Sequence, residues 1–334
     1  MTARRVRGVA LLVTAATLVF ASGCAGSSGN SAAPPAVEKP NLNVAVVPAL
    51  DSAGFFVALH EGLFRAEGLN VHFTPAVSSD TVISAQVAGK YDITAGNYVS
   101  YIQAQQDGAA NLDIFAEGSV MTPGAQSIFV MPNSPIKTLA DLSHHTLAIN
   151  APKNVLYLLA ASVLAEHGIS PGSVDFVTKG AFPQMITALK SGAIDAAMLP
   201  EPFASIAEQA DGAVPLADMD QGATTNFPVE GYVVTKQWAQ RYPRTLAAFD
   251  KALQEGQQIA DTNRSAVEQA MEDLPAPYGV PKETAAVMSL DDYPFTSGAA
   301  GSVDEVRLQR VVDVMQQFLG FDSSFNINSM LTGG

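Results

Sequence analysis

The strongest constraint in this sequence is an internal repeat with an offset of 103 residues. The stretches VISAQVAGKYDITAGNY (82–98) and MITALKSGAIDAAMLPEPF (185–203) both indicate the end of a helix, a glycine turn, a buried strand and a loop. At this offset Gly89 aligns with Gly192, and Asp92 aligns with Asp195. A repeat of about 100 residues is too long for a solenoid. It predicts two similar lobes, and a cleft between such lobes is a natural place for a ligand.

Each copy of the repeat predicts a β-α-β-α-β unit, and such alternation is typical of parallel sheets. The expected fold class is therefore α/β, with two lobes, each a mainly parallel sheet flanked by helices, and two hinge crossings between them. From residue 236 onward the pattern is mostly helical, and these helices are expected to return and cover the first lobe. The expected boundaries are 41–130 plus 236–334 for lobe one and 131–235 for lobe two.

The first 23 residues have the parts of a secretory signal peptide: three arginines, the apolar run 9–20 and the small residues 21–23. Cys24, the only cysteine, follows directly and has no partner for an internal disulfide. This placement resembles a bacterial lipobox, whose cysteine is acylated, for example with palmitate. Residues 24–40 have the composition of a flexible tether. The prediction is a lipoprotein on the extracytoplasmic face of the cell membrane. The alternatives are a short membrane anchor or a secreted protein, and the export route (Sec or twin-arginine) stays open.

The charge balance argues against nucleic-acid binding. The chain has 18 basic and 32 acidic residues. Without the three leader arginines the balance is 15 against 32, a net charge of −17. Nucleic-acid binding needs basic patches that neutralise phosphates.

Signatures of catalysis and cofactor binding are missing from the sequence. It contains no GxGxxG after a strand, no GxxxxGK[ST], no HExxH and no GxSxG. The one histidine pair, His144-His145, is adjacent, and neighbouring side chains point in different directions. We therefore predict no catalytic residue, no cofactor and no metal site.

Polar loops that follow strands and open helices are the candidate binding elements. In open α/β sheets ligands bind at the carboxyl ends of the strands, where helix N-termini offer unpaired N–H groups. The same side chains could act simply as helix caps. The candidate ligand-binding residues are Asp51, Ser52, Ser79, Asp80, Thr81, Asn97 and Tyr98 in lobe one, and Asn150, Lys153, Asn154 and Glu201 in lobe two. Phe182 is a possible stacking surface.

The charges in these loops favour a small neutral or amino-bearing ligand. Lys153 is their only basic residue, and a strongly charged anion would normally attract arginine as well. Asp51, Asp80 and Glu201 could accept hydrogen bonds from amino or ring N–H groups. Helix N-termini could still bind a sulfonate unaided.

Two runs carry a family resemblance. SAGFFVALHEGLFRAEGLNV (52–71), followed by AQVAGKYDITAGN (85–97), resembles the solute-binding proteins of ABC transporters in the nitrate, sulfonate, taurine and thiamine-precursor group. ALKSGAIDAAMLPEPF (188–203) is also similar to that group, and the likeness covers about 42–320. It implies a periplasmic-binding-protein fold of type II, which captures a sulfonate, nitrate, pyrimidine or similar solute by hinge closure. The implied partners are an ABC permease and its ATPase. The chain departs from the group at 49–51, where relatives often carry an aromatic residue.

Two other functions stay open at this point. The same group resembles a thiamine-pyrimidine synthase, an enzyme that uses lysine, histidine and a cysteine cluster, but the loop after Asp92 has neither lysine nor histidine. A sensory surface lipoprotein is the second alternative. A monomer is expected, and the sequence does not name the ligand.

Overall fold

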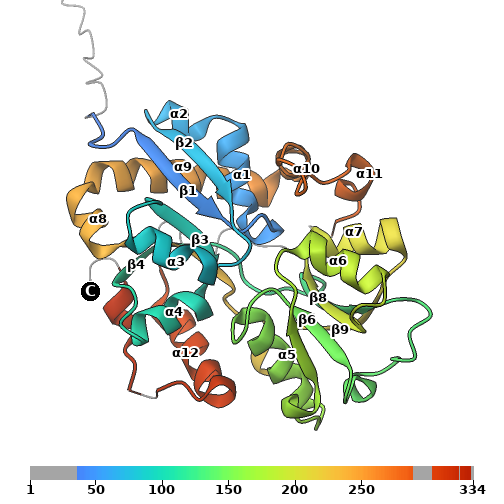
Figure 1. Ribbon diagram of the computed structural model, residues 1–334. Helices are drawn as coiled ribbons and strands as arrows, with labels where there is room; N and C mark the ends of the chain where they lie inside the picture. The colour runs from blue at the N-terminus through green and yellow to red at the C-terminus, as the bar shows by residue number, and fades with distance from the viewer. Residues whose placement is uncertain (1–35, 289–302, 323, 332–334) are drawn as a thin grey trace, which may run out of the picture. The chain divides into compact units, whose positions relative to one another are not determined.

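The computed structural model describes residues 36–288, 303–322 and 324–331 (Figure 1). Residues 1–35 form a unit of their own, and all of the described residues belong to the second unit, 36–334. The predicted signal peptide, Cys24 and nearly all of the tether lie outside the described residues.

Two five-stranded sheets form the framework of the second unit (Figure 1). In spatial order, the first contains β2 (Asn70–Pro75), β1 (Asn41–Val46), β3 (Ile93–Asn97), β10 (Glu230–Thr235) and β4 (Leu112–Glu117). The second contains β7 (Asp175–Thr178), β6 (Thr146–Ile149), β8 (Ala196–Pro200), β5 (Gln126–Val130) and β9 (Val214–Asp218). In each sheet three neighbouring strands are parallel, and the fourth is antiparallel to both of its neighbours. The predicted two-lobed α/β fold is confirmed.

The two sheets follow the repeat seen in the sequence. An offset of 103 residues carries β3 onto the span of β8 and superposes the spans of β1, β2 and β4 on those of β6, β7 and β9 to within two residues at each end. The order of the strands is also the same in both sheets. The repeat therefore describes two copies of one topology.

The strand pairing corrects the predicted boundaries of the lobes. Strand β5 follows the first repeat in the chain but pairs with β8 and β9, and β10 follows the second repeat but pairs with β3 and β4. The boundaries predicted from sequence, which put 126–130 in lobe one and 230–235 in lobe two, are wrong for these two strands. The strand that follows each repeat thus joins the sheet of the other repeat. The apolar pattern within a strand does not reveal which sheet the strand joins.

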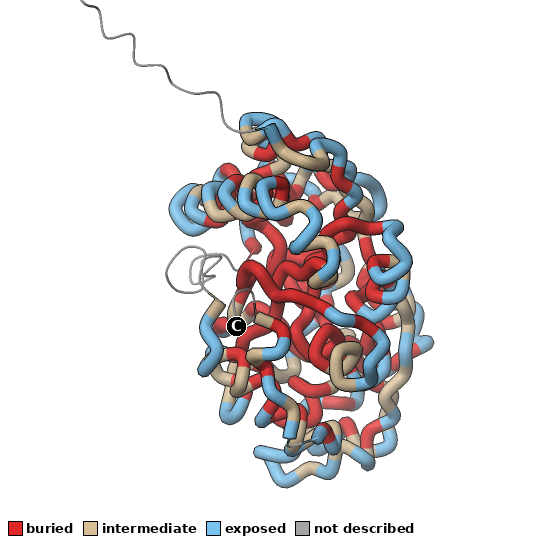
Figure 2. The backbone as a smooth tube through the Cα atoms, turned by 90° about the vertical axis from the view of Figure 1, so that its left-hand side faces the viewer, coloured by how far each residue is buried: buried red, intermediate tan, exposed pale blue. Residues whose placement is uncertain are grey.

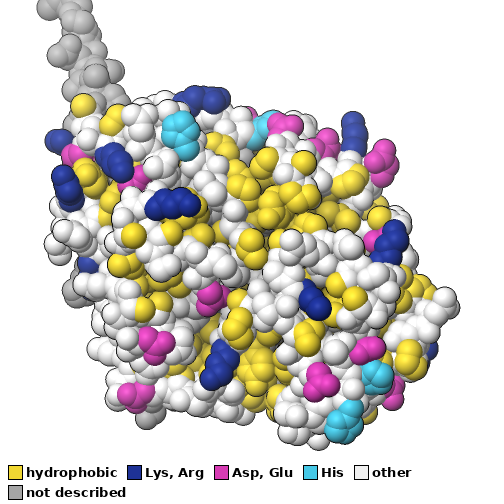
Figure 3. Space-filling model, viewed as in Figure 1, with side chains coloured by type: hydrophobic (Ala, Val, Ile, Leu, Met, Phe, Trp, Pro, Cys, Tyr) yellow, Lys and Arg dark blue, Asp and Glu magenta, His cyan; other side chains and the backbone are white. Residues whose placement is uncertain are grey.

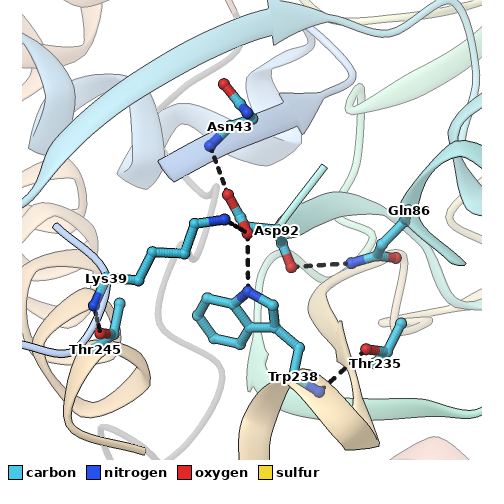
Figure 4. Close-up of polar contacts among 7 residues, drawn as sticks. All are labelled: Lys39, Asn43, Gln86, Asp92, Thr235, Trp238 and Thr245. Atoms are coloured by element: carbon cyan, nitrogen blue, oxygen red, sulfur yellow. Dashed lines mark hydrogen bonds and ion pairs between the residues drawn. The ribbon is translucent and has the colours of Figure 1, made fainter. Parts of the chain in front are cut away.

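Asp92 and Asp195, the aspartates matched by the repeat, hold equivalent strands, and Figure 4 shows the contacts of Asp92. The Asp92 carboxylate accepts hydrogen bonds from the backbone N–H of Asn43 in β1 at 2.9 Å, from Trp238 Nε1 at 2.8 Å and from Lys39 Nζ. Asp195 accepts from the backbone N–H of Thr146 in β6 at 2.8 Å, and Thr146 is the repeat equivalent of Asn43. Both aspartates therefore hold the first strand of their own repeat in place.

Helices cover the faces of both sheets (Figure 1). Around the first sheet are α1 (Ala53–His60), α2 (Leu63–Ala66), α3 (Asp80–Val87), α4 (Tyr98–Gln106), α8 (Lys236–Arg241), α9 (Pro243–Thr262) and α10 (Arg264–Glu272). Around the second are α5 (Val155–Glu166), α6 (Phe182–Lys190) and α7 (Phe203–Asp211). The helix α11 (Lys282–Ala285) packs against α7 and α10, and α12 (Glu305–Leu319) packs against both α4 and α5.

Late helices complete the core of the first lobe. Helix α9 crosses α1 where two glycines let the backbones approach: a Cβ on Gly256 would lie 2.3 Å from the carbonyl oxygen of Gly54. Phe249 of α9 stacks on Phe64 of α2 with 4.7 Å between ring centroids. Figure 2 shows the buried segments running through the interior, with exposed segments around them.

Candidate functional site

A narrow pocket lies between the two sheets, at the ends of their strands. Its lining comes from both lobes: Val47, Ala49, Asp51, Ser79, Asn97, Val229 and Glu230 on one side, and Gln126, Asn150, Val155, Leu156, Phe182 and Pro200 on the other. The volume of this partly open pocket is about 30 Å³, which is room for about two water molecules. The pocket occupies the place where ligands bind in open α/β sheets.

The lining residues come in pairs related by the repeat. The 103-residue offset relates Val47 to Asn150, Ser79 to Phe182 and Asn97 to Pro200. The exchanged strands add a fourth pair, because Glu230 pairs with Asn97 and Gln126 pairs with Pro200. The pocket is therefore built from equivalent positions of the two lobes, with different side chains on the two sides.

Two chain segments connect the sheets and run beside each other. They are 118–125, between β4 and β5, and 219–229, between β9 and β10. Met121 N donates to Phe227 O at 2.7 Å, and Val120 and Pro228 form an antiparallel bridge. The lobes also touch across the pocket, because Leu50 N donates to Glu201 O at 2.9 Å. A paired two-strand connection of this kind is a suitable hinge.

A pair of buried carboxylates marks the lobe-one side of the pocket. Asp51 lies in a short 3₁₀ helix after β1, and Ser119 Oγ donates to its Oδ1 at 2.7 Å. Glu230 is the first residue of β10, and Ser52 Oγ donates to its Oε1. Burial and the nearby charge of Asp51 raise the pKa of Glu230 well above its usual range. A buried carboxylate pair of this kind is typical of functional sites.

Ser79 and Asn97 form a hydrogen-bonded unit beside these carboxylates. Both the backbone N–H and the side-chain amide of Asn97 donate to Ser79 Oγ at 2.9 Å. The other side-chain atom, Asn97 Oδ1, accepts from Ser100 N at 2.9 Å and so caps α4. The cap fixes Asn97 at the end of β3, where it lines the pocket.

On the lobe-two side, a second helix cap, Asn154, holds a lining residue at the end of a strand. Asn154 Oδ1 accepts from Leu156 N at 3.1 Å and caps α5, while Asn154 Nδ2 donates to Asn150 Oδ1 at 2.5 Å. This holds Asn150 at the end of β6. Phe182 stacks on Phe203 with 4.9 Å between ring centroids and gives the pocket an aromatic wall.

Four of the candidate residues predicted from sequence line the pocket: Asp51, Ser79, Asn97 and Asn150. The other seven lie outside its lining. Ser52 and Asn154 hold lining residues in place through their hydrogen bonds. Glu201 is buried and accepts from Ser205 Oγ at 2.8 Å, so its side chain is bound to the first turn of α7. Tyr98 is buried with its ring against Gly231.

The last three candidates are exposed. Asp80 accepts from Ser100 Oγ at 3.0 Å. Thr81 Oγ1 donates to Ser78 O at 2.7 Å. Lys153 has a left-handed backbone conformation (φ 53°) in the turn before α5.

Sequence reasoning missed Gln126 and Glu230. Both are polar residues that begin a mostly apolar strand after a loop, and this position is the signal that the sequence offers. Their place in the pocket depends on the exchange of β5 and β10 between the sheets.

A second pocket of about 250 Å³ is lined by residues of lobe one, among them Asp92, Trp238 and Tyr242. No continuous basic surface crosses the described residues on the face in Figure 3. Within the described ranges, no group of three His, Cys, Asp or Glu residues could hold a metal ion. In the same part of the chain, no helix combines the length and apolar character needed to cross a bilayer.

Solved structures show which class of fold this is. The nitrate-binding protein NrtA from Synechocystis has a TM-score of 0.76 at 17% identity, covering 89% of this chain and 87% of that one. The alkanesulfonate-binding protein SsuA from Xanthomonas axonopodis, bound to MOPS, has a TM-score of 0.74 at 17% identity, covering 89% and 99%. The desulfurization enzyme DszB has a TM-score of 0.63 at 15% identity, covering 88% and 96%. The chain has the two-lobed periplasmic-binding-protein fold.

The family follows from the sequence comparison. The model of the NMT1-like family matches residues 35–273, and the chain belongs to that family. Among curated relatives, the bicarbonate transport ATP-binding protein CmpC of Synechocystis is 27% identical over 242 residues, which are 66% of this chain and 35% of that protein. The nitrate import ATP-binding protein NrtC of the same organism is 26% identical over 245 residues, covering 68% and 36%. The chain thus spans about a third of the length of these relatives.

Proposed function

We propose that the protein is the solute-binding component of an ABC importer. The observation that carries this proposal is the pocket between two repeat-related lobes, lined from both sides and joined by a paired two-strand hinge. Binding proteins for nitrate and alkanesulfonate share the fold, and the curated relatives are ATP-binding proteins of bicarbonate and nitrate transport.

Capture requires the lobes to move. The pocket has room for about two water molecules, so an organic solute enters only when the lobes separate. The contact between Leu50 and Glu201 then opens, while the paired connections around 120 and 228 keep the lobes attached. Closure surrounds the solute with residues of both lobes and excludes water.

We further propose that the pocket-lining residues Asp51, Ser79, Asn97, Asn150, Phe182, Gln126 and Glu230 contact the solute. Ser52, Asn154 and Glu201 hold the surrounding structure, and Cys24, when acylated, keeps the protein at the extracytoplasmic face of the membrane beside its permease and ATPase. The tethered receptor then releases its solute to the permease.

A thermal-shift screen against a broad solute library tests this function. A true ligand at about 100 times its Kd stabilises the protein by about 2.7 kcal/mol, which raises the melting temperature by a few degrees. Isothermal titration calorimetry then gives the stoichiometry, expected to be one solute per chain. If no compound in the library raised the melting temperature, this result would count against solute binding.

One observation favours a second candidate, an enzyme. The fold is shared with a desulfurization enzyme, and buried carboxylates with raised pKa values occur in active sites. Turnover of a bound solute, followed by mass spectrometry over hours, would favour this candidate. Recovery of the solute unchanged favours transport.

A further inference from the structure

The charged side chains of the pocket are all acidic. Asp51 and Glu230 line it, and none of its 13 lining residues is Lys, Arg or His. Lys153, the basic residue that the sequence placed nearby, is exposed and lies outside the lining. A ligand at this position therefore meets negative charge, and burial strengthens the interaction because the local dielectric constant is low.

A buried acceptor in the pocket also points to a ligand. Gln126 is 2% exposed and lines the pocket, and its Oε1 has no hydrogen-bond partner among the described residues. A buried polar atom that stays unpaired costs about 1–3 kcal/mol. A ligand that donates a hydrogen bond to this oxygen would remove the cost.

Helix N-termini are the other source of anion-binding groups, and side-chain caps already occupy the first-turn N–H groups of two of them. Asn97 caps α4 and Asn154 caps α5 by accepting from their first-turn N–H groups. Among the helices that begin beside the pocket without an N-cap side chain, α1 follows Asp51 and Ser52, and α3 begins with the acidic residue Asp80. A third, α6, begins Phe182-Pro183, and proline has no N–H to donate.

The two lobes present different chemistry to a ligand. Lobe one lines the pocket with the polar residues Asp51, Ser79, Asn97 and Glu230, and lobe two supplies the apolar residues Val155, Leu156, Phe182 and Pro200 together with Gln126 and Asn150. At the repeat-related positions, Ser79 of lobe one corresponds to Phe182 of lobe two and Asn97 to Pro200, while Val47 corresponds to Asn150. A ligand between the lobes therefore meets the polar groups of lobe one and Gln126, and it also meets the aromatic and aliphatic side chains of lobe two.

We propose that the solute is a small nitrogenous molecule with an amino, amidine or amino-substituted ring group, which donates hydrogen bonds to Glu230 and Gln126 next to the charge of Asp51. Its apolar part lies against Phe182 and Leu156. This inference rests on the proposed solute-binding function and specifies the class of solute. It excludes nitrate, bicarbonate and sulfonates as ligands.

The experiment is a thermal-shift panel with matched chemical classes, followed by calorimetry. One half holds primary amines, amidines and aminopyrimidines, and the other holds nitrate, bicarbonate, alkanesulfonates and aromatic carboxylates without an amino group. We expect shifts only in the nitrogenous half. A shift with an anion from the second half overturns the inference and leaves the solute-binding function standing. No shift in either half overturns the function itself.

Variants then test the assigned residues with the tightest nitrogenous compound. Glu230→Gln is expected to weaken its binding by at least about tenfold, the loss of about 1.4 kcal/mol that is reasonable for one charge-assisted hydrogen bond. Gln126→Leu, which keeps the size but removes the acceptor, is a second variant in case the first folds poorly, and should weaken binding about fivefold or more. Asp250→Asn on α9 is the matched acid-to-amide control and should leave Kd within about twofold. Unchanged binding in both Glu230→Gln and Gln126→Leu overturns the assignment.

Discussion

The matched aspartates Asp92 and Asp195 should differ strongly in what they contribute to stability. They hold equivalent strands, but the Asp92 side chain is 4% exposed and the Asp195 side chain is 43% exposed. In Asp92→Ala, the Trp238 indole, the Asn43 N–H and the Lys39 ammonium all lose their acceptor (Figure 4). Hydrogen bonds to a charged group contribute about 1.5–3 kcal/mol each, and with three of them removed from a 4% exposed carboxylate we expect a loss of about 3–5 kcal/mol.

In Asp195→Ala water can replace the lost carboxylate. Two hydrogen bonds to Thr146 are removed, at 2.8 Å and 2.7 Å. A hydrogen bond contributes about 1 kcal/mol net to stability. At this exposed position, solvent screening reduces the additional electrostatic contribution of the carboxylate charge. We expect a loss of about 1–2 kcal/mol, so the two variants should differ by about 2–3 kcal/mol.

Urea unfolding of the two variants and the wild type measures this difference. Circular dichroism reports both lobes, and Trp238, the only tryptophan, reports the first lobe, which matters if the lobes unfold separately. Asp92→Asn serves as a control that keeps the shape and removes the charge, with an intermediate loss expected. Equal losses in Asp92→Ala and Asp195→Ala, within about 0.5 kcal/mol, would refute the reasoning that burial sets the energy of these contacts.

Three further outcomes are expected. Burial and Asp51 raise the pKa of Glu230 in the folded state above 4.5, so the folded protein loses stability as pH rises from about 4.5 through the raised pKa. Glu230→Gln should remove this loss. If the free energies of unfolding in urea of wild type and Glu230→Gln follow parallel curves against pH, this explanation is wrong. Gly256→Ala should destabilise the protein by about 1–3 kcal/mol through overpacking against Gly54. Helix propensity alone would favour alanine by about 1 kcal/mol, so a raised melting temperature would contradict the close crossing of α1 and α9. Cys24→Ser should shift the protein from the membrane fraction to the soluble fraction and abolish palmitate labelling, and unchanged fractionation would argue against the lipid anchor.

The sequence predicted the parts of the fold that depend on local pattern. Among the candidate residues that could act as helix caps, Asn97 and Asn154 cap α4 and α5. The 103-residue offset predicted two copies of one unit and matched Asp92 with Asp195. These features depend on residues close in sequence, where periodicity and capping act directly.

The sequence could also give a set of candidate loops, but only part of the pocket. Asp51, Ser79, Asn97 and Asn150 follow strands and lie where parallel strands bring their ends together. The same rule selected Glu201 and Tyr98, whose side chains are directed into supporting contacts instead. Direction of a side chain at the end of a strand depends on its packing partners, which are distant in sequence.

Only the tertiary structure decided the exchange of the last strand of each repeat. It carries Gln126 into the second sheet and Glu230 into the first, and so places one unpaired acceptor and one buried carboxylate in the pocket. Strands far apart in the sequence pair because the chain crosses twice between the lobes, and no local signal encodes that choice. The sequence by itself determined two lobes and a cleft, while the long-range pairing determined the chemistry of the cleft.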